Sequence, residues 1–158
     1  MDDNKLQKKY ELVKSTMDKL EHTKTGELYL FVVGIDSYLK ERNLNYCKKD
    51  ANEFISIFHK HNDIKKKNVY SLFDEYATKK NIISRLDEFR KTLNANDRLI
   101  IYFAGHGHNT DFSNFFIPHD GNQDNYISCI PNNFIAKSVT ELESDFILLF
   151  YDLNFSKI

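Results

Sequence analysis

The sequence predicts an α/β domain with a mostly parallel sheet and helices on both of its faces. Residues 28–35, 98–105 and 145–153 are almost continuously apolar, which is typical of strands covered on both sides. Segments with helical periodicity separate these runs, and such alternation favours right-handed crossovers between parallel strands. The chain of 158 residues has the length of one domain with a substantial core.

The first predicted element is an amphipathic helix. Five apolar residues with a 4-3-4-3 spacing fall on one helical face: Leu6, Tyr10, Val13, Met17 and Leu20. Two heptads are too few to establish a coiled coil, so we expect this face to pack on the domain itself, and a partner helix is the alternative. We assign residues 1–25 to this helix and its turn, and residues 26–158 to the α/β domain.

The remaining elements alternate between strand and helix. In chain order we expect a strand at 28–35, a helix at 48–61, a strand at 68–75, a helix at 81–93, a strand at 98–105, a short extended segment at 114–120, a helix at 131–139 and a strand at 145–153. Functional residues of such open sheets gather beyond the carboxyl ends of the strands.

Composition excludes several partner classes. The 22 basic and 23 acidic residues nearly cancel, so no overall field favours nucleic acid or an anionic membrane. Cys47 and Cys129 show no metal-ligand spacing and fit free thiols in a reducing compartment. The sequence has no signal-peptide pattern and no apolar stretch near the roughly 20 residues that span a bilayer, so we expect a cytoplasmic protein.

The segment IIYFAGHGHNTD places the glycine-flanked His106 just past the end of a predicted strand. An imidazole there can serve as a general base if a thiol or hydroxyl lies within hydrogen-bond reach. The last predicted strand would bring Asp152 and Asn154 to the same edge of the sheet. The alternative is that His106 is a polar residue that ends a buried strand.

Taken in order, several segments resemble the caspase and metacaspase clan of cysteine endopeptidases. GIDSY resembles the clan's Gly-Ile turn, CKKDANEF its Cys-x-x-Asp-Ala helix start, and YFAGHGHN the strand with its catalytic histidine. FFIPHD resembles a Leu-Pro-x-Asp segment, and FILLFYDLNFS the strand that ends in Asp-x-Cys-x-Ser-Gly. The resemblance covers residues 28–156 and implies a three-layer caspase-like (caspase-hemoglobinase) fold that ends after the large-subunit half.

The same resemblance implies that the nucleophile is missing. When Asp152 is aligned with the clan's Asp-x-Cys, Asn154 takes the place of the nucleophilic cysteine. A carboxamide forms no accessible anion and is not a useful nucleophile at neutral pH. Ser156 would lie about 6–7 Å further along the strand, and Cys129 has no motif around it. We therefore expect His106 to be a retained dyad histidine without a nucleophile.

In the metacaspase branch, a cysteine and two aspartates line a pocket for a basic side chain. The matching residues here are Cys47, Asp50 and Asp152, and the resemblance implies a peptide with a basic residue as ligand. Ala104 stands where the family has a small hydroxyl residue. The alternative is that Asp50 only caps a helix whose first turn begins at Ala51.

A metal centre is a further alternative, without support from a zinc motif. His106, His108 and His119 with Asp120 could in principle hold zinc for a hydrolase, but no Cys-x-x-Cys or His-Glu-x-x-His accompanies them. We expect these histidines to be strand-end residues, with no metal and no cofactor.

The sequence thus predicts a caspase-like domain that has lost cysteine endopeptidase activity and acts by protein binding, regulation or assembly. The alternative is a fragment or subunit of an active caspase-like endopeptidase with a His/Cys dyad. Active members of the clan continue into a small-subunit half, so the strand from Asp145 to Tyr151 would become an edge strand. We expect a second copy, a separate chain or the N-terminal helix to cover it.

Overall fold

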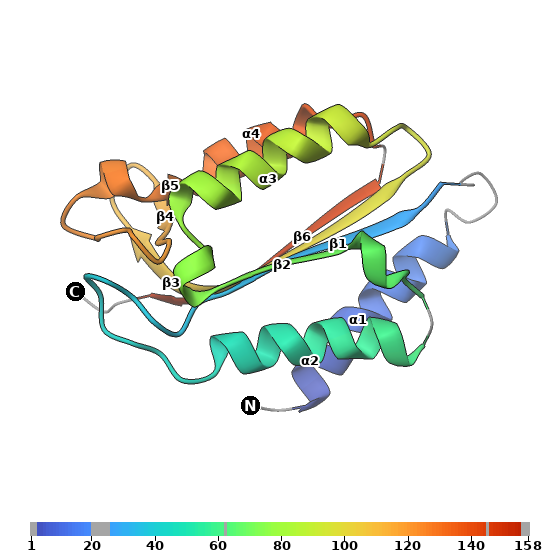
Figure 1. Cartoon of the computed structure of the whole chain (residues 1–158), viewed down its shortest axis with the longest axis horizontal. Coiled ribbons are helices and arrows are strands. Elements are labelled where there is room, and N and C mark those ends of the chain that lie inside the picture. The colour runs from blue at the N-terminus through green and yellow to red at the C-terminus, as the bar shows by residue number, and fades with distance from the viewer. Residues whose placement is uncertain (1–2, 20–25, 62, 145, 156–158) are drawn as a thin grey trace.

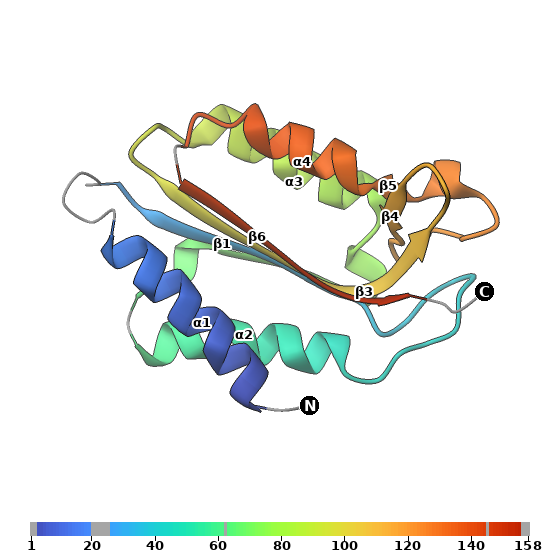
Figure 2. The same ribbon diagram turned by 180° about the vertical axis from the view of Figure 1, so that it is seen from behind.

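The protein folds into three layers, with a sheet between two layers of helices (Figure 1). The computed structural model describes residues 3–19, 26–61, 63–144 and 146–155. Helices α1 and α2 cover one face of the sheet, and α3 and α4 cover the other, as Figures 1 and 2 show. The predicted α/β architecture is therefore confirmed.

The elements follow the predicted order. The helices are α1 (Asp3–Asp18), α2 (Cys47–Lys60), α3 (Lys79–Thr92) and α4 (Asn132–Thr140). The strands are β1 (Leu28–Gly34), β2 (Val69–Phe73), β3 (Arg98–Asn109), β4 (Asn114–Phe116), β5 (Ile130–Pro131) and β6 (Phe146–Phe155). Short 3-10 turns occupy Lys66–Asn68, Asp74–Tyr76 and Tyr126–Ser128.

The sheet is parallel in its main part. β1 pairs with β2 on one side and β3 on the other, and β3 also pairs with β6, all in parallel. β4 pairs antiparallel with the end of β3, and β5 with β4. Within the described residues β6 pairs with β3 alone, so it is an edge strand. The predicted edge position is thus present in the structure.

The strand that carries His106 is longer than its apolar run. We expected the strand to end at residue 105 and His106 to follow it, but β3 continues to Asn109. The reason is pairing on both sides, since β6 pairs as far as Gly107 and β4 pairs from Gly107 to Asn109. His106 is therefore a strand residue with only 6% of its surface exposed.

Helix α1 shares a core with the sheet. Its apolar side chains Leu6, Tyr10, Val13 and Met17 are buried together with Phe54 and Phe58 of α2 and residues of β1 and β3. Burying a side chain of this size contributes about 1.5–3 kcal/mol, so this face is not available to a partner helix. The expected packing on the domain is confirmed, whereas Leu20 lies outside the described residues.

Gly34 allows α2 to approach the end of β1. A Cβ atom at this position would lie 2.8 Å from the Cβ of Ala51 and 3.0 Å from the carbonyl oxygen of Cys47. Any larger residue would push the first turn of α2 away from the sheet. The glycine thus places Cys47 and Asp50 at the carboxyl edge of the parallel strands.

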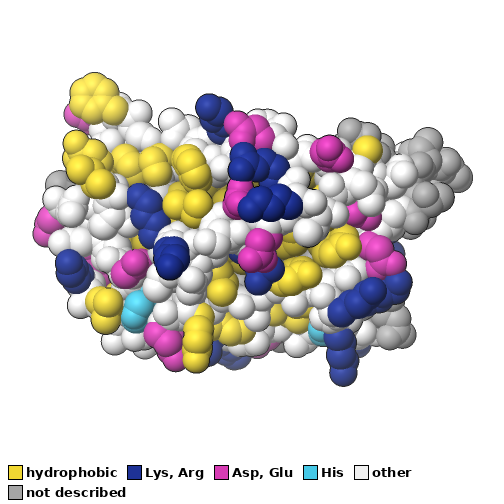
Figure 3. All heavy atoms as spheres, turned by 45° about the horizontal axis from the view of Figure 1, so that its top comes forward, with side chains coloured by type: hydrophobic (Ala, Val, Ile, Leu, Met, Phe, Trp, Pro, Cys, Tyr) yellow, Lys and Arg dark blue, Asp and Glu magenta, His cyan; other side chains and the backbone are white. Residues whose placement is uncertain are grey.

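The surface carries interspersed charges of both signs. On the side that α3 and α4 cover, basic and acidic side chains lie next to one another (Figure 3). Ion pairs within α3 join Arg90 and Lys91 to Asp87 and Arg85 to Glu88. Among the described residues, no helix combines the length and the apolar character needed to cross a membrane.

Candidate functional site

The loop between β1 and α2 is held by two aspartates. Asp36 caps α2, because its carboxylate oxygens accept hydrogen bonds from the backbone N–H groups of Cys47 (2.8 Å) and Lys48 (3.2 Å). Asp74, which has a positive φ of 44°, in turn accepts from the backbone of Asp36 (2.9 Å) and Ser37 (3.0 Å). The loop and the start of α2 are therefore fixed relative to β2.

This capping excludes one sequence interpretation of Asp50. We considered that Asp50 only caps a helix beginning at Ala51, but α2 begins at Cys47 and Asp36 supplies its cap. Asp50 lies inside the first turn of α2, and its side chain does not cap the helix.

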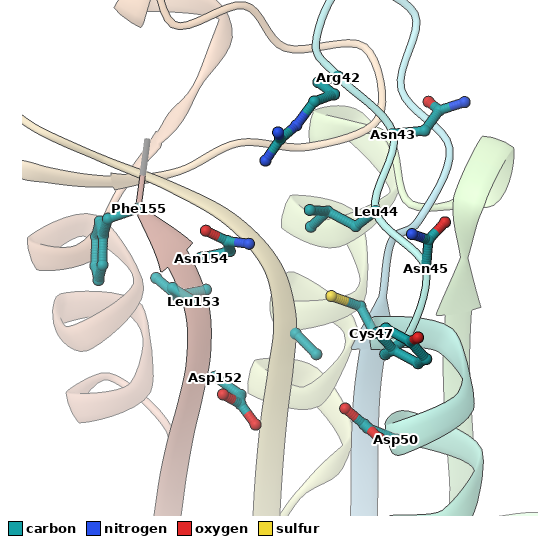
Figure 4. Close-up of a pocket in the computed structure, with 12 residues that line it drawn as sticks. Arg42, Asn43, Leu44, Asn45, Cys47, Asp50, Asp152, Leu153, Asn154 and Phe155 are labelled. Atoms are coloured by element: carbon teal, nitrogen blue, oxygen red, sulfur yellow. The ribbon is translucent and has the colours of Figure 1, made fainter. Parts of the chain in front are cut away.

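A cavity of about 630 Å³ opens between the loop, the start of α2 and the ends of β3 and β6 (Figure 4). Cys47, Asp50 and Asp152, which the resemblance had grouped as one pocket, all line it. Ala104 and Asn154 line it as well. Figure 4 shows the two carboxylates on the same side of the cavity, facing one another from α2 and β6.

Asp152 is already paired with the N-terminal helix. Lys5 Nζ lies 2.8 Å from one carboxylate oxygen, and Lys9 Nζ lies 3.2 Å from the other. The Tyr102 hydroxyl also donates to the carboxylate, at 3.3 Å. Burial opposes ionisation of Asp152, but the two lysines outweigh it and hold the pKa of this carboxyl below its usual value.

Asp50 lacks such partners. Only 2% of its surface is exposed, and its Oδ1 has no hydrogen-bond partner among the described residues. Burial, followed by the negative charge of Asp152, raises the pKa of Asp50 above its usual value. A buried carboxylate oxygen without a partner is costly. Asp50 lines the cavity, where a cationic group could pair with its carboxylate.

Cys47 is not an activated thiol. Burial, and then the charges of Asp36, Asp50 and Asp152, raise the pKa of Cys47 to about 12. The side chain therefore stays protonated at neutral pH, whereas a nucleophilic cysteine needs a lowered pKa. Cys47 contributes to the wall of the cavity as a small neutral group.

The ring of His106 is enclosed by backbone carbonyl groups. Its Nε2 lies 2.7 Å from the carbonyl oxygen of Arg42, and its Nδ1 lies 3.4 Å from the carbonyl oxygen of Asn154. The backbone N–H of His106 donates to the Tyr38 hydroxyl at 2.8 Å. His106 also lines a second cavity of about 500 Å³, which shares Arg42, Asn154 and Phe155 with the first. Both ring nitrogens thus face acceptors of the protein itself.

The glycines beside His106 provide room for neighbouring side chains. A Cβ atom at Gly105 would lie 2.6 Å from the Tyr38 hydroxyl, and one at Gly107 would lie 2.6 Å from the ring of Phe155. Neither glycine has a positive φ. The Gly-His-Gly sequence therefore serves close packing here, in addition to any freedom that it gives the histidine.

Asn154 lies directly opposite His106 in the parallel register of β3 and β6. Of the two other nucleophile candidates, Ser156 lies outside the described residues. Cys129 is fully buried, its Sγ donates to the carbonyl oxygen of Asn122 at 3.4 Å, and burial raises the pKa of its thiol. It does not line either of the two cavities beside Asn154.

The predicted histidine positions do not form a metal cluster. No group of three or more His, Cys, Asp or Glu side chains could hold a metal ion within the described residues. His119 instead places Nδ1 at 2.6 Å from the carbonyl oxygen of Ser37.

Sequence reasoning missed the residues that come from outside the recognised motifs. The sequence does contain a pattern for Lys5 and Lys9, since they form an i, i+4 basic pair beside the buried face of α1, which is typical of a shared acidic partner. Asp36 and Arg42 carry none, because their roles depend on how the loop folds back against β2 and His106.

Comparison with known proteins supports the resemblance. The family model of the caspase domain matches residues 29–153. A crystal structure of the protein GSU0716 from Geobacter sulfurreducens is similar, with a TM-score of 0.66, 17% sequence identity and 84% of this chain covered. The match covers 52% of that chain, so this protein spans about half the length of the solved structure. No curated protein matches the sequence. The chain belongs to the caspase-domain family.

Proposed function

We propose that this caspase domain has no peptidase activity of its own and acts by binding a peptide or protein through a basic side chain. The observation that carries the proposal is the pairing of Asn154 with His106 at the end of β3 and β6. The resemblance assigns this position to the nucleophilic cysteine, and a carboxamide cannot take that role.

The surroundings of His106 support the same conclusion. A general base needs a ring nitrogen that can accept a proton from a nucleophile. Here Nε2 faces the carbonyl oxygen of Arg42, and Nδ1 faces that of Asn154. Cys47 and Cys129 both have raised thiol pKa values, so neither supplies a thiolate in place of residue 154.

The carboxylates of the cavity support a cationic ligand. Asp50 has an unpartnered buried oxygen, and Asp152 adds a second negative charge on the same side. An ammonium or guanidinium group there would make charge-assisted hydrogen bonds, which are stronger than neutral ones. A lysine or arginine side chain therefore fits the cavity better than an acidic or apolar one.

The test of lost activity is cleavage of mixed fluorogenic peptides with basic or acidic residues before the reporter, with and without calcium. We expect no cleavage by the natural chain. The Asn154→Cys variant tests whether His106 and the cavity can support cleavage once a thiol is restored. Cleavage by the natural chain that disappears in His106→Ala would overturn the proposal. That result would favour the alternative, a fragment or subunit of an active caspase-like endopeptidase.

The test of binding uses labelled peptides that differ only at one residue, which is lysine, arginine, glutamine or glutamate. We expect fluorescence anisotropy to detect binding of the basic peptides alone, and Asp50→Asn to weaken it. The exposed Asp124→Asn is the matched control, because it removes one carboxylate that does not line this cavity. Equal binding of the four peptides would contradict a basic specificity.

The same proposal includes a partner at the sheet edge and a reducing compartment. No described strand pairs with the second edge of the ten-residue β6, and exposed edges are normally covered. Helix α1 contacts the face of β6 but does not pair with its edge.

The free cysteines Cys47 and Cys129 support a cytoplasmic setting.

A further inference from the structure

The cavity next to α2 carries opposite charges on its two sides. Figure 4 places Asp50 and Asp152 together on one side, with the Cys47 thiol between them and the rest of the cavity. On the other side, Arg42 extends from the loop toward Asn154. All five residues line the same space of about 630 Å³. A ligand that fills this space meets an anion at one end and a cation at the other.

The acidic side has one free position. Asp152 already accepts from Lys5, Lys9 and Tyr102, so its oxygens are satisfied within the protein. Asp50 is only 2% exposed, its Oδ1 has no hydrogen-bond partner among the described residues, and the residue lines the cavity. One cationic group of a ligand would therefore satisfy Asp50.

The opposite side is suited to an anion. The main chain of Arg42 is fixed, because its carbonyl oxygen contacts His106 Nε2 at 2.7 Å. Its guanidinium group pairs with no carboxylate among the described residues. The carboxamide of Asn154 adds an N–H donor on the same side. A guanidinium and an amide donor together are the groups that hold a carboxylate.

The geometry points to the C-terminal lysine or arginine of a peptide as the ligand, with its side chain at Asp50 and its terminal carboxylate between Arg42 and Asn154. The inference rests on the proposed function and adds that the site recognises the end of a chain. An internal residue would present only a neutral peptide carbonyl to Arg42. A chain end presents a full negative charge there.

Two aromatic side chains favour a peptide over a free amino acid. Tyr46 and Phe155 both line the cavity, and they are 59% and 42% exposed. Exposed aromatic rings beside a polar site offer apolar contact to the residues that precede the chain end. Free lysine or arginine would leave these rings unused.

The experiment measures fluorescence anisotropy of an N-terminally labelled hexapeptide that ends in lysine, prepared as the free acid and as the amide. A third peptide carries the same lysine in an internal position, and unlabelled lysine and arginine serve as competitors. Arg42→Gln and Asn154→Asp remove or repel the carboxylate interaction. Lys40→Gln is the matched control, because Lys40 is an exposed cation of the same loop that does not line the cavity.

We expect the free acid to bind at least about tenfold more tightly than the amide or the internal peptide, as one charge-assisted interaction implies. This preference should disappear in Arg42→Gln and Asn154→Asp and persist in Lys40→Gln. Equal binding of acid, amide and internal peptide would overturn the inference but leave the basic pocket standing. Competition by free lysine as strong as by the peptide would overturn the peptide requirement. Absence of binding by every basic peptide would overturn the proposed function as well.

Discussion

The ammonium group of Lys5 lies 2.8 Å from Asp152 Oδ1, so the first helix and the last strand meet at one carboxylate of the candidate site. Lys9 contacts the other oxygen of the same carboxylate at 3.2 Å. Partly exposed ion pairs of this kind contribute little to stability, commonly about 0–1 kcal/mol. Their effect on the cavity is electrostatic, because they offset one of its two negative charges.

Replacing both lysines should therefore strengthen binding of a basic peptide. In the double variant Lys5→Gln and Lys9→Gln, Asp152 loses its two cationic partners and becomes available to the ligand. We expect Kd to fall by about threefold to tenfold, as the removal of two nearby like charges implies. Lys8→Gln is the matched control, since Lys8 is an exposed cation on the same helix. Unchanged or weaker binding, with the helix intact by circular dichroism, would contradict this role.

Asp50→Asn should stabilise the fold at neutral pH. The pKa of Asp50 is raised in the folded state, so ionising this carboxyl costs free energy of folding at any pH above its folded-state pKa. We expect Tm to rise by about 2–4 °C at pH 7, which corresponds to about 1 kcal/mol for a chain of this size. Differential scanning calorimetry of the variant and the natural chain measures this difference.

The Tm difference between Asp50→Asn and the natural chain should depend on pH in a defined direction. Below the ordinary pKa of an aspartate, Asp50 is protonated in both the folded and the unfolded state, so the gain should vanish as the pH falls. Asp74 and Asp152 have lowered pKa values and act in the opposite direction, since their stabilisation is lost in acid. The contribution of Asp74 cancels in the comparison, whereas Asp152 is coupled to Asp50, so loss of the Asp50 charge further favours ionised Asp152 at neutral pH. A Tm difference that grows as the pH falls would contradict the assignment.

Tyr38→Phe should destabilise the strand that carries His106. The Tyr38 hydroxyl is the acceptor for the backbone N–H of His106, at 2.8 Å, and the contact is buried. Loss of the hydroxyl leaves a buried donor unpaired, which costs about 1–3 kcal/mol. Urea unfolding should show the loss as a lower midpoint, whereas the exposed Tyr46→Phe should leave the midpoint in place. Equal midpoints for Tyr38→Phe and the natural chain would show that water replaces the hydroxyl.

The open edge of β6 should make the purified chain associate. Sedimentation velocity at rising protein concentration should show a monomer that converts to larger species, because no strand within the described part of the chain pairs with this edge of β6. Raising the ionic strength should not reverse the association, since backbone pairing and apolar contact drive it. A single monomeric species at all concentrations would contradict a partner at this edge.

The elements of the fold could be predicted because each one has a local pattern. The apolar face of α1 and the continuous runs of β1, β3 and β6 follow from helical spacing and from burial on both sides. The end of β3 could not be predicted in the same way. Its last residues, GHGHN, have no strand preference and are extended only because β4 and β6 pair with them.

The candidate site was predictable only where a motif carried it. Cys47, Asp50 and Asp152 were grouped through the family resemblance, and the structure brings them to one cavity. The partners of Asp152 come from α1, nearly the whole chain away, and no local pattern links the two. The role of Asp50 was likewise open from the sequence, because only the structure shows that α2 begins at Cys47 and that Asp36, from the preceding loop, caps it.

The position of β6 after the other described strands in the sequence has a consequence for the order of folding. The ribosome makes β6 after β1 to β5, yet β6 pairs with β3 over ten residues and carries both Asp152 and Asn154. Contacts that join residues 147 positions apart, such as that between Lys5 and Asp152, form slowly because a long loop must close first. The nascent chain therefore leaves the tunnel with one edge of β3 open and its pocket unfinished. A chaperone that binds apolar strands would find its target there during synthesis.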